Sequence, residues 1–457
     1  MDQELLRSVD SFVRENRDNI LRDIARLVAV NSVAAEPEEN APNGRGAAEA
    51  LEVAFEICDE LGLKTHNCEN YLGYAQIGES EDYLATITHL DIVPFGEGWT
   101  GDPLVMRERD GYIIGRGVMD DKGASVLCLY MLKYLQEHVP LRYSVRALLG
   151  LSEETGMSDL EYYLAHYAPP LFCLSPDSNY PVCVGEKGLY GATIRAAQRC
   201  ERVKAIRGGV ASNVVPAKCE AWVEAERLMS TESVSAEYSD GLWHLTAHGV
   251  SGHASKPEGT VNAIGVMAHY LTDNGAVSGA ERALLEKLCL LYDDPDGSAL
   301  GIAADDGSFT PLTVVGGVIG MDDGYITQSV DSRFPTNTDA ERITAGLRTA
   351  FGELAEISPE RGIAPFFVPA ESPAVQCCMN AYEAVTGEKA GTYTTGGATY
   401  ARLFPSAAAF GPEHPERSAP DFAGPIHGAD EAACIDDLLE TLKIYILAFT
   451  ELLKLDR

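Results

Sequence analysis

Residues 83–91, Tyr-Leu-Ala-Thr-Ile-Thr-His-Leu-Asp, form an apolar strand pattern that ends in polar residues. The same design recurs in residues 143–154, which end in Ser-Glu-Glu, and in residues 171–177, which end in Ser-Pro-Asp. The intervening residues 122–137 and 158–166 have helical patterns. Strands that alternate with helices predict an α/β fold with a mostly parallel central sheet flanked by helices.

Polar side chains follow each of these strands, and ligands bind outside the carboxyl ends of parallel strands. His89 and Asp91 share one face of a strand end, so both could bind a metal, or one could orient the other. Glu153 and Glu154 point in different directions, so one could bind metal while the other transfers protons. Asp177 ends a buried apolar strand, where an unpaired carboxylate is costly. We therefore expect a site at this edge of the sheet.

Further candidates lie outside the strands. Asp120 and Asp121 precede a predicted helix, where they could cap it, but the flanking glycines also suit a backbone that approaches a ligand. His427 lies in a loop before the last helix, and His253 lies in a Ser-Gly-His-Ala-Ser segment. Nitrogen and oxygen ligands without thiolate suit zinc, manganese or cobalt, and several carboxylates suit a pair of divalent cations. The chain has no GxxxxGK loop and no GxSxG, so the corresponding phosphate and serine chemistries are not expected.

Composition narrows the class of protein. The 457 residues suffice for two domains. The formal net charge of −34 disfavours nucleic-acid and membrane partners. The eleven cysteines form no CxxC pair, which is typical of a reduced cytoplasmic protein. The sequence has neither a signal-peptide pattern at its start nor an apolar stretch long enough for a membrane span, and we expect a cytoplasmic location.

The pattern of elements changes along the chain. Residues 1–187 are expected to form the first part of a catalytic domain. Residues 188–370 carry short β-like runs and two helical stretches, and are expected to form an inserted α+β domain. Residues 371–457 should complete the catalytic domain.

The motifs as a set resemble the zinc-peptidase family that includes aminoacylases, the ArgE and DapE deacylases and the PepV-type dipeptidases. They occur in family order between residues 89 and 431, and they read HLDIVP, GRGVMDDKG, SEETG, SPDSNYP, GEKG, GHASKPEGTVNAI, TGGATYAR and HGADE. Trp99, the GGVASNVVP run and the size of the insertion are most similar to the PepV-type bacterial dipeptidases. That likeness implies a zinc-peptidase-like fold whose enlarged insertion is a lid, and a monomer.

The resemblance assigns roles to the metal candidates. His89 and Asp177 would bind one ion, and Glu154 and His427 would bind the other. Asp120 would bridge the two ions, and the peptide bond that follows it is expected to be cis.

The remaining roles concern catalysis and the substrate. Asp91 would orient the first histidine, Glu153 would be the general base, and His253 of the lid would polarise the scissile carbonyl. The residues that would hold the terminal carboxylate of the substrate are Asn213, Arg333, Gly396 and Gly397. PepV-type chains usually have a third glycine where this chain has Ala398, and its methyl group is expected to crowd the carboxylate site.

The resemblance therefore implies a cytoplasmic dipeptidase with two divalent cations, zinc before manganese or cobalt, and a small peptide as substrate. An N-acyl amino acid deacylase with the same two-metal site is the alternative among enzymes. A non-catalytic carboxylate- or metal-binding protein is the alternative outside them, and it is disfavoured because every expected ligand and base position is filled.

Overall fold

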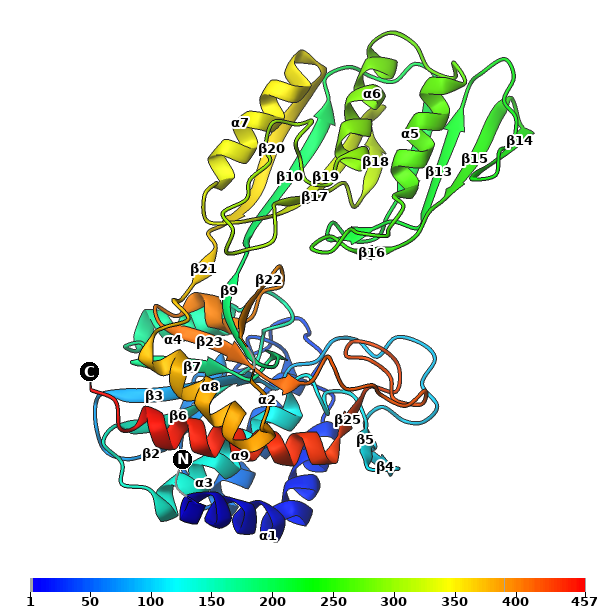
Figure 1. The fold of residues 1–457 in the computed structure, drawn as a ribbon. Coiled ribbons are helices and arrows are strands. Elements are labelled where there is room, and N and C mark those ends of the chain that lie inside the picture. The colour runs from blue at the N-terminus through cyan, green and yellow to red at the C-terminus, as the bar shows by residue number, and fades with distance from the viewer. Residues whose placement is uncertain (1–2, 390, 457) are drawn as a thin grey trace. The chain divides into compact units, whose positions relative to one another are not determined.

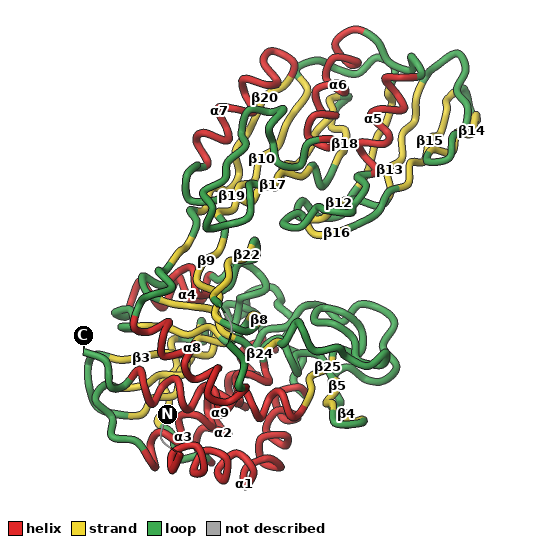
Figure 2. Tube along the Cα trace, in the orientation of Figure 1, coloured by secondary structure: helices red, strands yellow, loops and turns green. Residues whose placement is uncertain are grey.

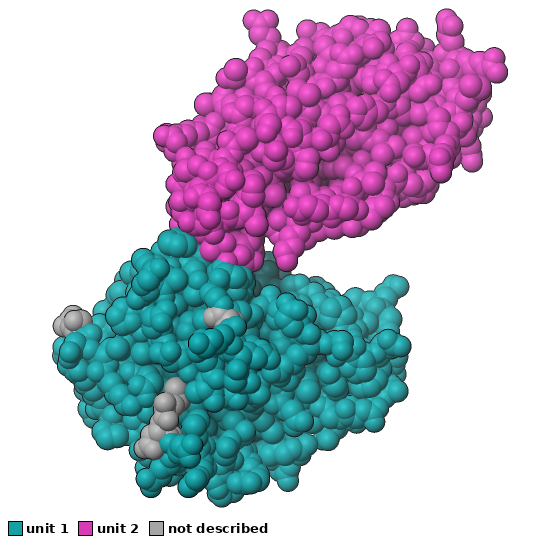
Figure 3. All heavy atoms as spheres, in the orientation of Figure 1, with its two compact units in different colours: residues 1–185, 367–393, 398–457 teal, residues 186–366, 394–397 magenta. Residues whose placement is uncertain are grey.

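The computed structural model describes residues 3–389 and 391–456. The chain divides into two compact units, which Figure 3 colours separately. The first contains residues up to 185, residues 367–393 and the chain from residue 398 onward.

The second unit contains residues 186–366 together with residues 394–397. It is an insertion in the first unit and begins close to residue 188, where the sequence pattern changes. It also includes residues 394–397, a glycine-containing segment within the expected second part of the catalytic domain.

The first unit is built on one sheet whose strands follow the order β1-β2-β6-β3-β7-β23-β9, with β21 and β22 continuing it at β9 (Figure 1). Strands β6, β3, β7 and β23 are parallel, whereas β1, β2 and β9 pair antiparallel. The predicted α/β class with a parallel centre is thereby confirmed. The strand bounds are Lys64–Cys68 (β1), Leu72–Ile77 (β2), Tyr83–His89 (β3), Ser144–Gly150 (β6), Phe172–Ser175 (β7), Val182–Glu186 (β9), Phe366–Phe367 (β21), Thr392–Thr395 (β22) and Ala407–Phe410 (β23).

Helices cover both faces of this sheet (Figure 2). A Cβ atom at Gly73 of β2 would meet Leu51 of one helix, α2, and a Cβ atom at Gly150 of β6 would meet Asp159 of another, α4. Because Gly73 and Gly150 point to opposite faces, these helices lie on opposite sides of the sheet. The helices of this unit are Gln3–Val28 (α1), Arg45–Glu60 (α2), Lys122–His138 (α3), Ser158–His166 (α4), Pro373–Thr386 (α8), Ile435–Leu452 (α9) and the short Tyr400–Leu403 (η2).

All seven residues of β3 are buried. A central parallel strand covered on both faces is expected to be buried along its whole length in this way. The polar residues of β3 before its end are Thr86 and Thr88, and its one ionisable histidine, His89, is the last residue. Two smaller sheets lie beside the strand ends, and they consist of Arg107–Arg109 (β4), Tyr112–Ile114 (β5) and Ala432–Cys434 (β25), and of Ser178–Asn179 (β8) and Pro412–Glu413 (β24).

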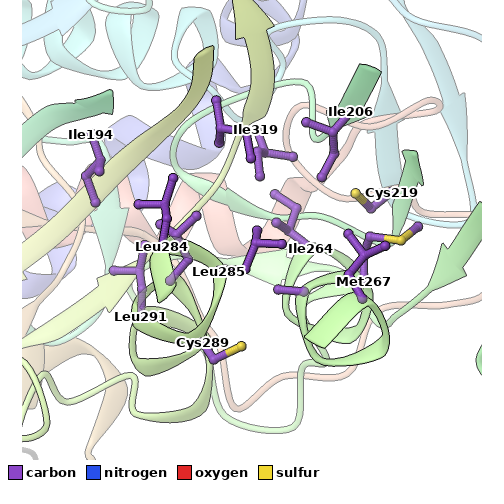
Figure 4. Close-up of a cluster of buried hydrophobic side chains, with 14 of the residues drawn as sticks. Ile194, Ile206, Cys219, Ile264, Met267, Leu284, Leu285, Cys289, Leu291 and Ile319 are labelled. Atoms are coloured by element: carbon purple, nitrogen blue, oxygen red, sulfur yellow. The ribbon is translucent and has the colours of Figure 1, made fainter. Parts of the chain in front are cut away.

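The second unit has its own antiparallel sheet, in the order β14-β15-β13-β11-β18-β19-β10-β20, with β17 on β19 and a separate β12–β16 pair. Its core is buried between this sheet and its helices, where Ile206 and Ile319 of the strands face Ile264 and Leu284 of the helices (Figure 4). The bounds are Gly188–Ala196 (β10), Val203–Gly208 (β11), Val214–Val215 (β12), Lys218–Val223 (β13), Val234–Ser239 (β14), Leu242–His248 (β15), Gly252–His253 (β16), Ala263–Asp273 (α5), Gly279–Asp293 (α6), Thr313–Val315 (β17), Ile319–Asp322 (β18), Tyr325–Phe334 (β19), Ala340–Phe351 (α7), Gly352–Leu354 (η1) and Ala355–Ile363 (β20).

Within the described residues, no helix combines the length and the apolar character needed to cross a membrane.

Candidate metal centre

Three strand ends of the first unit carry the acidic and histidine residues singled out in the sequence. His89 is the last residue of β3, Glu153 and Glu154 follow β6, and Asp177 follows β7. These strands are parallel neighbours, so their carboxyl ends meet at one edge of the sheet. His89 is buried at the end of its strand, whereas Glu153, Glu154 and Asp177 are partly buried in the turns that directly follow theirs.

Asp120 lies between two histidines from distant parts of the chain. Its Oδ1 is 3.0 Å from Nε2 of His89, and its Oδ2 is 2.9 Å from Nε2 of His427. The same Nε2 of His427 is 3.1 Å from Oε1 of Glu154. Each oxygen of Asp120 therefore faces a different histidine, and the peptide bond to Asp121 is cis, as the resemblance implies.

Two groups of candidate ligand atoms share this aspartate. One consists of His89, Asp120 and Asp177, and the other of Asp120, Glu154 and His427. Within each group the ligand atoms lie within 4.8 Å of one another. Imidazole nitrogens with carboxylate oxygens, and no thiolate among them, form a donor set that fits a pair of zinc, manganese or cobalt ions. The residues present thus fit two divalent cations that share one carboxylate.

The charges of this cluster also fit bound cations. Burial and repulsion between carboxylates raise the pKa values of Glu153 and Asp177 well above the ordinary range. Hydrogen bonds to Asp120 and Glu154 raise the pKa of His427 to about 10. Burial opposes ionisation of Asp120, but its hydrogen bonds from the two histidines outweigh burial and lower its pKa. In the protein alone, the cluster lowers its negative charge by retaining protons, and divalent cations would replace those protons.

Asp91 contacts the two glutamates of the site as well as His89. Nδ1 of His89 lies 3.0 Å from the carbonyl oxygen of Asp91 and 3.4 Å from its carboxylate. The two carboxylate oxygens also accept hydrogen bonds from the backbone N–H groups of Glu153 and Glu154, at 3.2 and 3.1 Å. One buried side chain therefore positions both the histidine and the pair of glutamates.

Asp121 does not belong to either ligand group. Its buried carboxylate accepts a hydrogen bond from the backbone N–H of His89 at 3.3 Å. Asp120, rather than Asp121, is thus the aspartate that the fold brings to the histidines.

Arg116 and Glu431, which were not among the predicted site residues, hold the loop of Asp120. Glu431 accepts a hydrogen bond from Nη1 of Arg116 at 2.7 Å and from the backbone N–H groups of Gly117, Met119 and Asp120 at 3.0–3.2 Å. Both side chains of the ion pair are 1% exposed. Arg116 also donates to backbone oxygens of Pro94, Phe95 and His427.

This arrangement connects the loop that carries Asp120 to the segment that carries His427. The only signal in the sequence was the position of the two residues in the GRGVMDDKG and HGADE motifs. Nothing in their spacing predicted that they would pair.

The other predicted site residues belong to the second unit, where the structure brings them together. Ala254 donates its N–H to the carbonyl of Asn213 at 2.9 Å, next to His253. Nδ1 of His253 is 2.8 Å from Oγ of Ser255, and a Cβ atom at Gly396 would lie 2.6 Å from Cβ of Ser255. A side chain larger than hydrogen is therefore excluded at Gly396.

Arg333 completes this group. It donates from Nε to Asp331 at 2.7 Å and from Nη1 to the carbonyl of Gly396 at 2.9 Å. Desolvation and the charge of Arg333 lower the pKa of His253, so the imidazole is neutral near pH 7. Gly397 follows in the same short segment of this unit, with its N–H bonded to Thr395.

Comparison with known proteins places the chain among peptidases. Residues 85–451 match Peptidase family M20/M25/M40. The chain is 30% identical to the Beta-Ala-Xaa dipeptidase of Lactobacillus delbrueckii subsp. lactis, with 96% of this chain and 97% of the relative aligned. It is 29% identical to the putative dipeptidase YtjP of Bacillus subtilis strain 168, with 97% and 99% aligned. The solved structure of human carnosine dipeptidase 1 covers 99% of both chains with a TM-score of 0.61 at 14% identity, which shows a shared fold.

The match spans most of the chain, and it includes the strand ends, the loop of Asp120 and the late histidine segment. The motif set had already indicated this family. The chain therefore belongs to peptidase family M20/M25/M40 and is a metallopeptidase.

Proposed function

We propose that this peptidase hydrolyses dipeptides with the help of two divalent cations, zinc before manganese or cobalt. The observation that carries the proposal is Asp120, whose two oxygens face His89 and His427 in two overlapping ligand groups. Asp177 would complete the first group and Glu154 the second. The two cations would supply Lewis acidity to the scissile carbonyl and to the attacking water.

Glu153 is proposed as the general base. It lies beside Glu154 but outside both ligand groups, so its carboxylate is not used as a ligand. Its raised pKa suits a group that accepts a proton from water during attack and returns it to the leaving amine. Asp91 holds the backbone N–H of Glu153 and so orients this base.

The inserted unit is proposed to be a lid that recognises the substrate. His253, neutral near pH 7, would donate a hydrogen bond to the carbonyl oxygen as negative charge develops there. Asn213 and Arg333 would bind the terminal carboxylate, with the backbone of Gly396 and Gly397 beside them. Closure of such a lid would exclude water from the reaction.

The composition of the chain supports a cellular location and a class of partner. All eleven cysteines are free, which supports a reducing, cytoplasmic environment. The net charge of −34 supports a small peptide rather than nucleic acid or a membrane surface as partner. We propose a monomer, because the insertion is as large as the lid that the PepV-type resemblance implies.

Dipeptides are preferred over N-acyl amino acids because both aligned relatives are named dipeptidases, one of them for β-alanyl substrates. A metal analysis followed by a panel of dipeptides and N-acetyl amino acids tests this choice. We expect two cations per chain and faster hydrolysis of the dipeptides. Selective hydrolysis of N-acetyl amino acids would establish the deacylase instead, and binding without turnover of any substrate would establish a non-catalytic protein.

A further inference from the structure

A cavity of about 310 Å³ lies in the first unit beside the candidate metal centre. Met119 and Ile426 line it, and each directly precedes a proposed cation ligand, Asp120 or His427. Glu413 lines the same cavity. The cavity is therefore placed to receive a part of the substrate that lies close to the scissile bond.

The backbone of Glu413 is held firmly. Glu413 is the last residue of β24, which pairs with β8. Strand β8 begins directly after the proposed ligand Asp177. The carbonyl oxygen of Glu413 accepts a hydrogen bond from the N–H of Tyr180 at 2.7 Å. Its side chain starts from a fixed point next to the metal centre.

The carboxylate of Glu413 has no partner among the described residues, which neither donate a hydrogen bond to it nor form an ion pair with it. Burial and the charges of Asp120 and Glu431 raise its pKa to about 7. An unpaired, partly buried carboxylate is unfavourable, and a cation placed next to it would be stabilised. Glu413 is outside both ligand groups, so it is not one of the proposed ligands of the two metal ions.

The other charged groups of the cavity are already paired. Asp437 forms an ion pair with Arg417, which also contacts Glu440 at 2.7 Å. Burial and Arg417 lower the pKa of His414, so it is uncharged near pH 7. Of the described carboxylates that line the cavity, Glu413 alone remains to bind a cationic ligand.

We propose that Glu413 binds an ammonium group of the substrate in this cavity. The inference rests on the proposed dipeptidase function. In a dipeptide, one carbon atom separates the N-terminal ammonium from the scissile carbonyl carbon, so an ammonium group must lie near the metal ligands. An ammonium also favours the ionised form of the carboxyl group beside it. N-acyl amino acids lack this charge, and Glu413 would therefore distinguish the two substrate classes.

The test compares the wild-type protein with Glu413→Gln, which keeps the shape and removes the charge. Alanylalanine is the substrate, and N-propanoylalanine, which lacks only the amino group, is measured as a substrate or competitive inhibitor. A hydrogen bond between charged groups contributes about 10- to 100-fold in binding. We expect kcat/KM for alanylalanine to fall by about this factor, mostly through KM, and the constant for N-propanoylalanine to remain unchanged. Glu416→Gln, an exposed carboxylate outside the cavity, is the matched control and should behave as wild type.

Two further measurements sharpen the result. Glu413→Asp keeps the charge and should recover part of the lost affinity. Lysylalanine and norleucylalanine distinguish the source of the ammonium: an equal loss for both identifies the N-terminal group, and a loss confined to lysylalanine identifies the side chain.

Several outcomes would overturn the assignment. They are an unchanged kcat/KM for every cationic substrate in Glu413→Gln, an equal loss for alanylalanine and N-propanoylalanine, or a loss of bound metal. If the metal-loaded wild-type protein hydrolyses no dipeptide, the proposed function fails and the assignment fails with it. If dipeptides are hydrolysed and only the selectivity is absent, the assignment alone is wrong.

Discussion

Replacing Arg116 by methionine should weaken both the fold of the first unit and its affinity for cations. Arg116 is the only charged donor among the described residues bonded to Glu431, and it also holds the backbone carbonyl of His427. Arg116→Met leaves the carboxylate of Glu431 buried with three backbone N–H donors from Gly117, Met119 and Asp120. The change keeps most of the side-chain volume and removes the charge.

The magnitude follows from the burial of the pair. Removing one partner of a buried ion pair costs about 3–5 kcal/mol. The three backbone donors that remain, and the ability of Glu431 to take up a proton, place the expected loss near the lower limit, about 3 kcal/mol. At about 2–4 °C per kcal/mol for a unit of this size, the metal-free protein should melt about 6–12 °C lower.

The melting temperature of the metal-free protein and the zinc affinity from a binding isotherm test this expectation. Arg116→Met should lower both the melting temperature and the affinity. The double change of Arg116→Met with Glu431→Gln should recover part of the stability, because an uncharged amide needs no charged partner and its oxygen still accepts from the backbone N–H groups, but not cation affinity, because the loop stays unanchored. Arg107→Met is the control, since its ion pair with Asp430 is more exposed and should cost less than about 1 kcal/mol. Equal melting temperatures for Arg116→Met and the control would refute the reasoning.

The remaining predictions concern single roles. Glu153→Gln should retain both cations and lose activity by several orders of magnitude, because only proton transfer is removed; a tenth of wild-type kcat would contradict this role. Asp120→Ala should lose affinity for both cations in a metal analysis, whereas Asp121→Ala should mainly disturb local backbone, and the reverse order would show that the wrong aspartate was chosen. His253→Ala should leave metal content unchanged and lower kcat by about a hundredfold or more, with the melting temperature measured beside it to exclude loss of structure. In the metal-free protein the pKa of His427 is raised from 6.5 to about 10. Protonation of His427 therefore stabilises the folded metal-free protein below pH 6.5, and this stabilisation is lost as the pH rises through 10. Cation affinity, measured by calorimetry, should increase with pH over this interval.

The sequence alone determined the fold class and most of the candidate ligands. Parallel strands buried on both faces are mostly apolar, so polar residues such as His89 and Asp177 are conspicuous where these strands end. Helix patterns were equally informative, because apolar spacing and terminal residues are local properties. Residues 158–166 were expected to be helical, and α4 has the same bounds.

Only the tertiary structure decided which segments that are distant in the chain contact one another. The two oxygens of Asp120 could not be assigned to two histidines from spacing, and the motifs that contain Arg116 and Glu431 do not show that these residues pair. The unpaired state of Glu413 likewise depends on which donors pack around it. Local patterns reflect backbone preferences, which neighbouring residues encode. The partners of a buried charge depend instead on the packing of the whole unit, which no stretch of sequence contains.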